Sequence, residues 1–434
     1  MPKIGNGLDA VTAFAGAAAA GMSLFLPFTF GIGSTLESPY RVTSLVNSVP
    51  RAAALGLIVA VVVAVLIRPI TRPGLVWLVA TGAAAASGVN YALGLWMTSA
   101  DVLSTQNYID ALTGGVLLGS LGICALRLWW AAIGFALGIV TVFVYGEVVA
   151  VFSSNTAATA QTAVHTPIWL IGGACVLLAA NTLRHRHGFM PTPSPRLAAD
   201  LPISPIVSIT VLSLSLLLAT EWLGLEFDGR RSNFGSIAVA VTVTVVAAFI
   251  AAVLLPGRDG AAVLVAVSLA AAGDALGDAE ALGPHLVLVL AIGAAAILAG
   301  LRWATPWGAL LGVGAVCVFA ALADRLPWSI AWTSGVVLLS AATGFAAGSV
   351  RVTYLPSAVL GIGALYLPSV LWSIPTRHRQ WPTSSTPVDE GTPGRVALAI
   401  TIGAAAALML LYRIRPATPA AVATPADPDP TPEP

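Results

Sequence analysis

Residues 51–71 read RAAALGLIVAVVVAVLIRPIT, an apolar run that contains charge only at Arg51 and Arg68. About 20 helical residues cross the hydrocarbon core of a bilayer, so this run has the length of one membrane span. In lipid a single segment satisfies its backbone hydrogen bonds only as a helix, which predicts a transmembrane helix here. The whole chain of 434 residues is similar in character, because 57% of it is hydrophobic and 9% is charged.

Segments of this kind fill the chain almost from end to end. We expect about 14 of them, separated by short polar loops, and hence an all-α, polytopic integral membrane protein. The expected spans are residues 9–31, 51–71, 74–97, 110–128, 130–152, 165–184, 204–224, 234–255, 260–279, 284–302, 305–325, 329–350, 354–373 and 396–413. The first is longer than the apolar region of a signal peptide, so we expect it to be retained.

The basic residues indicate the orientation of these spans. If the N-terminus is cytoplasmic, nearly all loops on that side are very short and each carries at least one Arg, such as Arg68, Arg127, Arg302 and Arg351. Short loops are the ones over which the positive-inside rule counts. We therefore expect a multi-pass protein of the plasma (inner) membrane with both termini in the cytoplasm.

A faint internal repeat suggests a duplicated six-helix unit. The run Leu126-Arg127-Leu128-Trp129-Trp130 is similar to Leu301-Arg302-Trp303, and Ala92-Leu93-Gly94 matches Ala275-Leu276-Gly277. We therefore expect an N-terminal six-helix bundle over residues 1–184, a Pro-rich cytoplasmic linker over 185–203 and a C-terminal six-helix bundle over 204–350. Two additional helices with a polar outer loop follow over 351–413, and a disordered tail over 414–434.

Two parallel six-helix bundles joined by a cytoplasmic linker resemble the transporters of the major facilitator superfamily. The resemblance covers about residues 9–350 and is one of architecture. The superfamily's signature loop after its second helix pairs an Asp with a Gly-Arg-Lys cluster, and here that loop reads Arg68-Pro-Ile-Thr-Arg-Pro-Gly74. The resemblance implies a pathway between the two bundles. Six, six and two helices also resemble the lipid-linked oligosaccharide flippases of the MurJ kind.

Ionisable residues within spans are costly and suggest function. Asp274 and Asp278 share one face of the ninth span, where like charges favour the binding of a proton, unless the helix ends earlier and both are wetted. Glu147 is a second candidate for proton coupling, or a structural acid that reaches the membrane surface. Asn90 could hydrogen-bond a polar substrate or join two helices.

Four arginines are expected near the outer ends of spans in equivalent places of the two bundles: Arg41, Arg51, Arg230 and Arg231. Guanidinium groups there could form bidentate hydrogen bonds with a phosphate or carboxylate. The alternative, which we favour, is that they form ion pairs with Glu37, Glu226 and Asp228.

Missing motifs restrict the possible activities. The chain has no Walker A loop, no H-E-x-x-H and no G-x-S-x-G sequence, so we expect neither an ATPase nor a hydrolase. Cys124, Cys175 and Cys317 lie within spans, and His185 and His187 lie in the expected linker, so we expect no metal and no cofactor. The expected partners are membrane lipids and an unknown small-molecule or lipid-linked substrate, with other membrane proteins as further candidates, but not nucleic acid.

Three functions remain open from the sequence. The first is a secondary transporter or flippase that works by alternating access between two helical bundles. The second is a non-catalytic scaffold of a cell-envelope assembly or secretion machinery. The third is a membrane glycosyltransferase that uses lipid-linked sugars, with Glu37 or Asp101 as the outward-facing acid.

Overall fold

The computed structural model describes residues 2–24, 39–94, 100–149, 168–186, 203–228, 234–276, 286–325, 328–375, 388–389 and 391–416. These residues form fourteen α-helices, which confirms the all-α fold and the expected number of helices. In order they are α1 (Pro2–Leu24), α2 (Pro39–Ile67), α3 (Pro73–Gly94), α4 (Ala100–Ala125), α5 (Trp129–Val149), α6 (Ile168–His185), α7 (Ser204–Asp228), α8 (Phe234–Leu254), α9 (Ala261–Leu276), α10 (Leu286–Arg302), α11 (Pro306–Leu322), α12 (Trp328–Ser349), α13 (Leu355–Gly363) and α14 (Thr392–Ile414).

The apolar length of these helices agrees with a polytopic membrane protein. Nine segments in the described part of the chain are long and apolar enough to cross a membrane, and five shorter apolar helices accompany them. The expected span 354–373 is helical but interrupted. After α13 come the 3-10 segments η3 (Ala364–Tyr366) and η4 (Val370–Ser373), and Pro368 lies between these two segments, where its missing N–H prevents a continuous helix.

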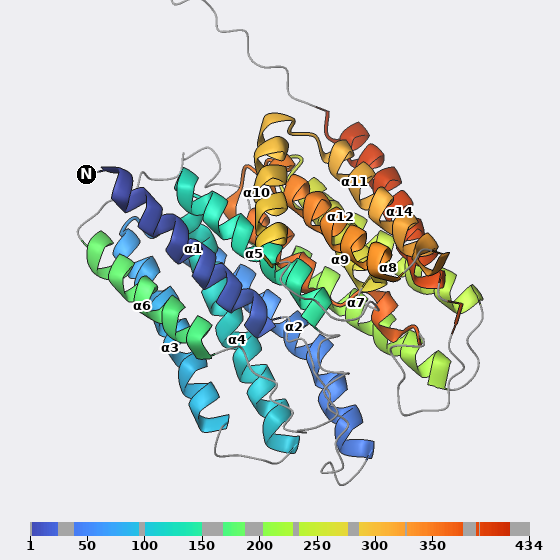
Figure 1. The fold of residues 1–434 in the computed structure, drawn as a ribbon, viewed down its shortest axis with the longest axis horizontal. Coiled ribbons are helices and arrows are strands. Elements are labelled where there is room, and N and C mark those ends of the chain that lie inside the picture. The colour runs from blue at the N-terminus through green and yellow to red at the C-terminus, as the bar shows by residue number, and fades with distance from the viewer. Residues whose placement is uncertain are drawn as a thin grey trace, which may run out of the picture.

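Helices α1–α6 form one bundle, which lies at the left and lower side of Figure 1, with α2 at its right-hand edge. Helix α1 packs against α4, α5 and α6, while α2 packs against α4 and α3 against both α4 and α6. The contact between α2 and α4 is close because Gly115 and Gly119 face the backbone carbonyls of Gly56 and Ala60. Small residues at such contacts allow helices to approach each other in a membrane.

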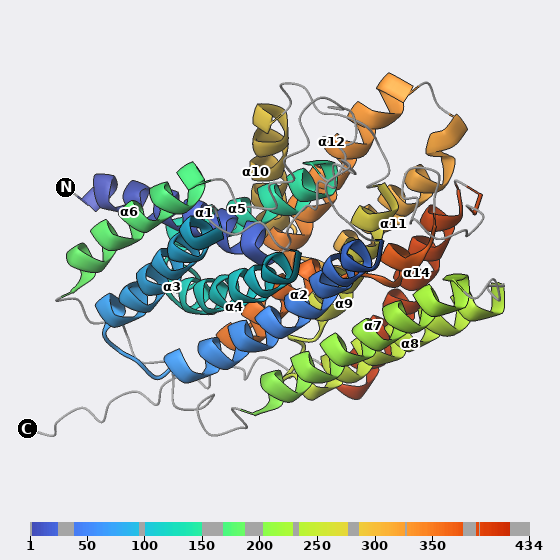
Figure 2. The ribbon, with the colours of Figure 1, turned by 90° about the horizontal axis from the view of Figure 1, so that it is seen from below.

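Helices α9–α14 repeat this pattern of contacts. Helix α10 packs against α12 as α2 does against α4, and α11 packs against α12 and α14 as α3 does against α4 and α6. Helix α9 packs against α14 as α1 does against α6. The remaining helices, α7 and α8, pair with each other and lie beside α2 and α14 at one edge of the molecule (Figure 2).

Two arginines occupy equivalent places in this repeat. Arg127, which follows α4, donates hydrogen bonds to the carbonyl oxygens of Arg68 and Ile70 at 2.8 and 3.4 Å. Arg351, which follows α12, donates to the carbonyl oxygen of Leu301 at 3.4 Å. Both guanidinium groups therefore satisfy carbonyls at the C-terminal end of a helix, where a cation is also favoured by the helix dipole.

The helix contacts favour a division of the chain that differs from the expected one. We propose that residues 2–185 and 261–414 are the two six-helix units, and that residues 204–254 (α7 and α8) are a pair inserted between them. The sequence instead predicts a C-terminal bundle at 204–350 with the additional helix pair after it, at 351–413. In the new division the loop at Arg302 corresponds to that at Arg68, not to that at Arg127.

Candidate functional site

A cavity of about 790 Å³ lies between the two units at the end of the helices that carries Arg68, Arg127, Arg302 and Arg351, which we name the basic end. Its walls are formed by α5 of the first unit and by α9, α10, α12 and α13 of the second, mostly through aliphatic side chains. Trp129 at its rim is 59% exposed, so the cavity reaches the surface there. Cavities of ~300–1,000 Å³ between domains are typical of small-ligand sites.

Two cations lie at the rim of this cavity, one from each unit. They are Arg127, which is partly buried, and Arg351, which is exposed. Burial lowers the pKa of Arg127, and the neighbouring Arg68 lowers it further. An arginine nevertheless stays protonated in proteins. The rim is therefore positively charged.

Beside the cavity, the two units are in contact at the basic end. The guanidinium carbon of Arg68, after α2, lies 4.4 Å from the centre of the Tyr354 ring, which precedes α13. Asp259 holds this segment: its carboxylate accepts the N–H and O–H of Thr353 and the N–H of Tyr354, each at 2.9 Å. Asp259 is 2% exposed, and burial raises its pKa although these hydrogen bonds oppose the shift.

The interrupted segment after α13 is hydrogen-bonded to Asp274, the acid predicted from the sequence as a site residue. Ser369 donates its backbone N–H and its hydroxyl to Oδ2 of Asp274 at 3.1 and 2.5 Å, and both residues are buried. Asp274 lies about 20 Å along α9 from Ala261. An interrupted helix at membrane depth is tolerated where it is buried in protein, and such breaks often form ion and substrate sites in transporters.

Away from the basic end, further contacts join the units to each other and to α7 of the inserted pair. Arg51 of α2 forms an ion pair with Glu221 of α7 at 2.5 Å. The hydroxyl of Ser373 in η4 donates to the carbonyl oxygen of Thr220 in α7 at 2.6 Å. The Tyr366 ring of η3 lies against Gly21 of α1, and its hydroxyl is 3.5 Å from the carbonyl oxygen of Ile139 in α5.

The other predicted site residues fall into two groups. Asn90 is buried in α3, where its amide donates to Oδ1 of Asp110 and to the carbonyl oxygen of Gln106, so it joins α3 to α4. Arg51 is paired with Glu221 rather than with the acids named from the sequence. The remaining residues lie outside the described residues, or have side chains that do: Glu37, Arg41, Asp101, Glu147, Asp278, Arg230 and Arg231. Their roles stay predictions.

Sequence reasoning missed Asp110. It lies within α4, about 15 Å from the first residue of that helix, and is 7% exposed. The sequence placed it at the edge of a span, where an acid is unremarkable. Next to it, both amide atoms of Gln106 are buried without a hydrogen-bond partner among the described residues. The expected span begins at residue 110, whereas α4 begins at Ala100, so the polar residues from Thr105 to Asp110 belong to the helix.

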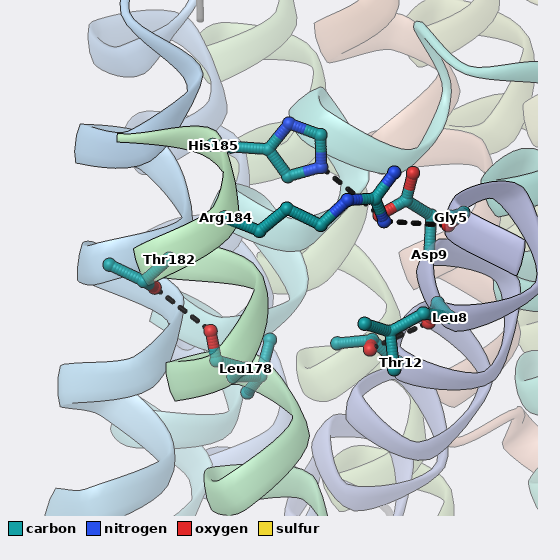
Figure 3. Close-up of polar contacts among 8 residues, drawn as sticks. All are labelled: Gly5, Leu8, Asp9, Thr12, Leu178, Thr182, Arg184 and His185. Atoms are coloured by element: carbon teal, nitrogen blue, oxygen red, sulfur yellow. Dashed lines mark hydrogen bonds and ion pairs between the residues drawn. The ribbon is translucent and has the colours of Figure 1, made fainter. Parts of the chain in front are cut away.

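A second missed acid, Asp9, holds the ends of α1 and α6 together (Figure 3). Its Oδ1 accepts a hydrogen bond from Arg184 at 3.0 Å, and the Nε2 of His185 lies 3.1 Å away from the same oxygen. The His185 ring also stacks on Trp77 of α3, with 6.1 Å between ring centres. His185 is therefore part of the first bundle. Groups of three or more possible metal ligands are absent from the described part of the chain.

Comparisons with known proteins give an architectural likeness only. The sequence matches no family model and no curated protein. Among solved structures it is similar to the xylose transporter XylE from E. coli, with 12% identity, a TM-score of 0.47 and coverage of 94% of this chain and 97% of that one. It is also similar to the POT family transporter PepTSo, with 13% identity, a TM-score of 0.44 and coverage of 94% of this chain and 96% of that one. The human organic anion transporter TETRAN is similar with 13% identity, a TM-score of 0.44 and coverage of 94% of this chain and 98% of that one.

Proposed function

We propose that this chain is a secondary transporter that works by alternating access between its two six-helix units. The observation that carries the proposal is the asymmetry of the boundary between the units. At the basic end a cavity opens between them beside the Arg68–Tyr354 contact. Farther along, Tyr366 contacts Ile139 across the boundary, and Arg51 pairs with Glu221 of α7, which Ser373 joins to the second unit. Rocking of the units about this boundary would close the cavity at one end and open it at the other.

Thiol labelling tests this proposal without a known substrate. In a background where the three native cysteines are serine, Ala136→Cys places a thiol in the cavity and Ser373→Cys places one near the Arg51–Glu221 contact. A membrane-impermeant maleimide added to vesicles of either orientation measures access from each side. We expect Glu221→Gln to increase labelling of Ser373→Cys and to decrease labelling of Ala136→Cys.

This reciprocal change distinguishes transport from a scaffold. A scaffold needs no exchange of access, so Glu221→Gln would alter labelling at Ser373→Cys alone or at neither position. The matched control is Asp389→Asn, which removes the acid of an exposed ion pair with Arg395. Independent behaviour of the two thiols would refute alternating access and favour the scaffold.

Asp274 is the proposed coupling acid. An ionised carboxylate accepts both hydrogen bonds from Ser369 on Oδ2. Protonation on Oδ1 leaves Oδ2 as an acceptor but removes the charge that strengthens both bonds, so it loosens the link. Protonation would thus act on the break after α13, which lies between the units. Because maleimide reacts with the thiolate, labelling is divided by that of the denatured protein at the same pH. We expect this ratio for Ala136→Cys to depend on pH in the wild-type background and to lose this dependence in Asp274→Asn. An unchanged pH dependence would exclude Asp274 and leave Glu147, whose matched test is Glu147→Gln.

A flippase is the closest alternative, since it would use the same movement on a lipid-linked substrate. The proposal assigns no catalytic residue, so the chain is taken as a transporter rather than an enzyme. Both six-helix units and the inserted pair are needed for the boundary described above, so the experiments use the full chain.

A further inference from the structure

The walls of the cavity at the basic end are unsuited to a sugar or a nucleoside. On α5 they consist of Ala132, Ile133 and Ala136, and on α9 of residues such as Val265 and Leu269. The hydroxyl deeper in the cavity, that of Thr343, already donates to the carbonyl oxygen of Leu339. A ligand rich in hydroxyl groups would lose its water here without gaining partners, which costs free energy for each unpaired group.

The rim is chemically different from the walls. Among the residues that the structure describes, those that line the cavity include Arg127 and Arg351 but no acidic side chain. The carbonyl oxygens that these arginines contact do not cancel their charge. A guanidinium group binds a carboxylate or phosphate with charge-assisted hydrogen bonds. The exposed ring of Trp129 lies beside them. Its apolar ring and polar N–H could contact a ligand where its apolar chain meets its polar head.

We propose that this cavity binds a single-chain amphipathic anion, with the anionic head between Arg127 and Arg351 and the apolar chain along α5. Trp129 and Ala136 mark the two ends of the accessible α5 wall, and they are about 10 Å apart along the helix. The length and the volume of the cavity suit one extended chain with a carboxylate or phosphate head. This inference rests on the proposed function only in taking the cavity as the substrate site.

Binding can be measured with dibromostearate, because bromine quenches the fluorescence of a nearby tryptophan. In lipid nanodiscs the wild-type protein should show saturable quenching that is lost in Trp129→Phe. Arg351→Gln should raise the dissociation constant at least about tenfold, which corresponds to ~1.4 kcal/mol. The uncharged methyl ester should bind weakly and should not distinguish the two proteins. The matched control is Arg413→Gln, an exposed arginine of α14 that does not line the cavity.

A second variant tests the apolar chain separately from the head. Ala136→Phe fills the wall of α5 but leaves both arginines in place, so it should reduce the affinity for dibromostearate more than that for a short-chain bromoacid. Dodecyl phosphate and dodecanoate, used as competitors, distinguish a phosphate from a carboxylate head. Arg127→Gln is used only if it folds, because Arg127 also satisfies carbonyls after α2.

Quenching that is equal in wild type, Arg351→Gln and Ala136→Phe would overturn the inference. It would place the probe in the bilayer or in the apolar groove between α11 and α14, which Trp307, Leu311 and Ile402 line. The labelling experiment with Ala136→Cys and Ser373→Cys needs no ligand. Reciprocal labelling without specific quenching would therefore reject the amphipathic anion and keep the transporter, and specific quenching without reciprocal labelling would do the reverse.

Discussion

Asp259 should be among the most important polar residues for the stability of this protein, although it lies in a short loop. It caps α13 from a distance in sequence, since no side chain of the α13 segment itself caps that helix. In Asp259→Ala the buried N–H of Tyr354 loses its acceptor, which costs ~1–3 kcal/mol. The N–H and hydroxyl of Thr353 lie at an exposed residue and can bond to water, so their loss adds about 1 kcal/mol, as for an ordinary helix cap.

We therefore expect Asp259→Ala to lower the free energy of unfolding by ~2–4 kcal/mol. Asp259→Asn keeps one acceptor oxygen and should cost roughly half as much. The control is Asp389→Asn, whose ion pair with Arg395 is 3.4 Å long and largely exposed and should contribute ~0–1 kcal/mol. The assay is thermal unfolding in detergent with a thiol-reactive dye, because Cys124 and Cys317 are free and buried.

The same series has a pH dependence of defined sign. Burial raises the pKa of Asp259 in the folded protein above the unfolded value of about 3.9, so the folded state binds the proton more tightly. Its contribution to stability is then fully present below about pH 3.9 and falls as the pH rises through the folded pKa. The advantage of wild type over Asp259→Asn should shrink over that window. Equal stability of Asp259→Ala and Asp389→Asn, or an advantage that grows with pH, would refute the reasoning.

Three further predictions concern the helix contacts. Arg51→Glu and Glu221→Arg should each destabilise the protein, and the double exchange should recover ~0.2–1 kcal/mol in a double-mutant cycle of thermal unfolding, because the pair is partly exposed. Gly119→Ala should destabilise by ~1–3 kcal/mol because its Cβ would overlap the carbonyl oxygen of Ala60, whereas Gly82→Ala, which meets open space, should stabilise by ~0.5–1 kcal/mol in the same melting assay. Gln106→Leu should leave the melting temperature unchanged or raise it, since it removes two buried amide atoms that have no partner in the described structure, and a lower melting temperature would show that the amide is solvated.

The sequence predicts the helices well because membrane insertion depends on the hydropathy of each segment alone. Fourteen helices and the positions of the arginines at helix ends follow from that property. It left open whether Asp274 is buried or wetted, and the structure buries it. The order in which helices pair depends on side-chain fit between segments, which hydropathy does not report. The faint repeat therefore linked Arg127 to Arg302, whereas the division that we propose from the helix contacts pairs Arg127 with Arg351.

The site was harder to predict for a related reason. An acid such as Asp110 looks interfacial when the hydrophobic segment begins beside it, and only the contacts with α3 show that it is buried. Likewise, Pro368 indicates a helix end but not which residue forms hydrogen bonds with the chain there. The link between Ser369 and Asp274 joins residues from two segments far apart in the chain. Such a link follows from the packing of α9 against η3 and η4.

The contacts of the segment from α13 to η4 also indicate where the moving boundary lies. The segment is joined to α9 and its preceding loop through the hydrogen bonds of Asp259 and Asp274, and to α7 through that of Ser373.

Toward the first unit, the contacts of the same segment are mostly apolar or cation–π contacts. They include the Arg68 guanidinium over the Tyr354 ring, apolar packing of Gly363 against Leu57 and of Val359 against Gly122, and a hydrogen bond of 3.5 Å from Tyr366. Apolar and cation–π contacts exchange partners at lower cost than buried hydrogen bonds, whose loss leaves polar groups unpaired. The segment should therefore move with α9 and α7, and the surface that slides should be the one it presents to α1, α2, α4 and α5.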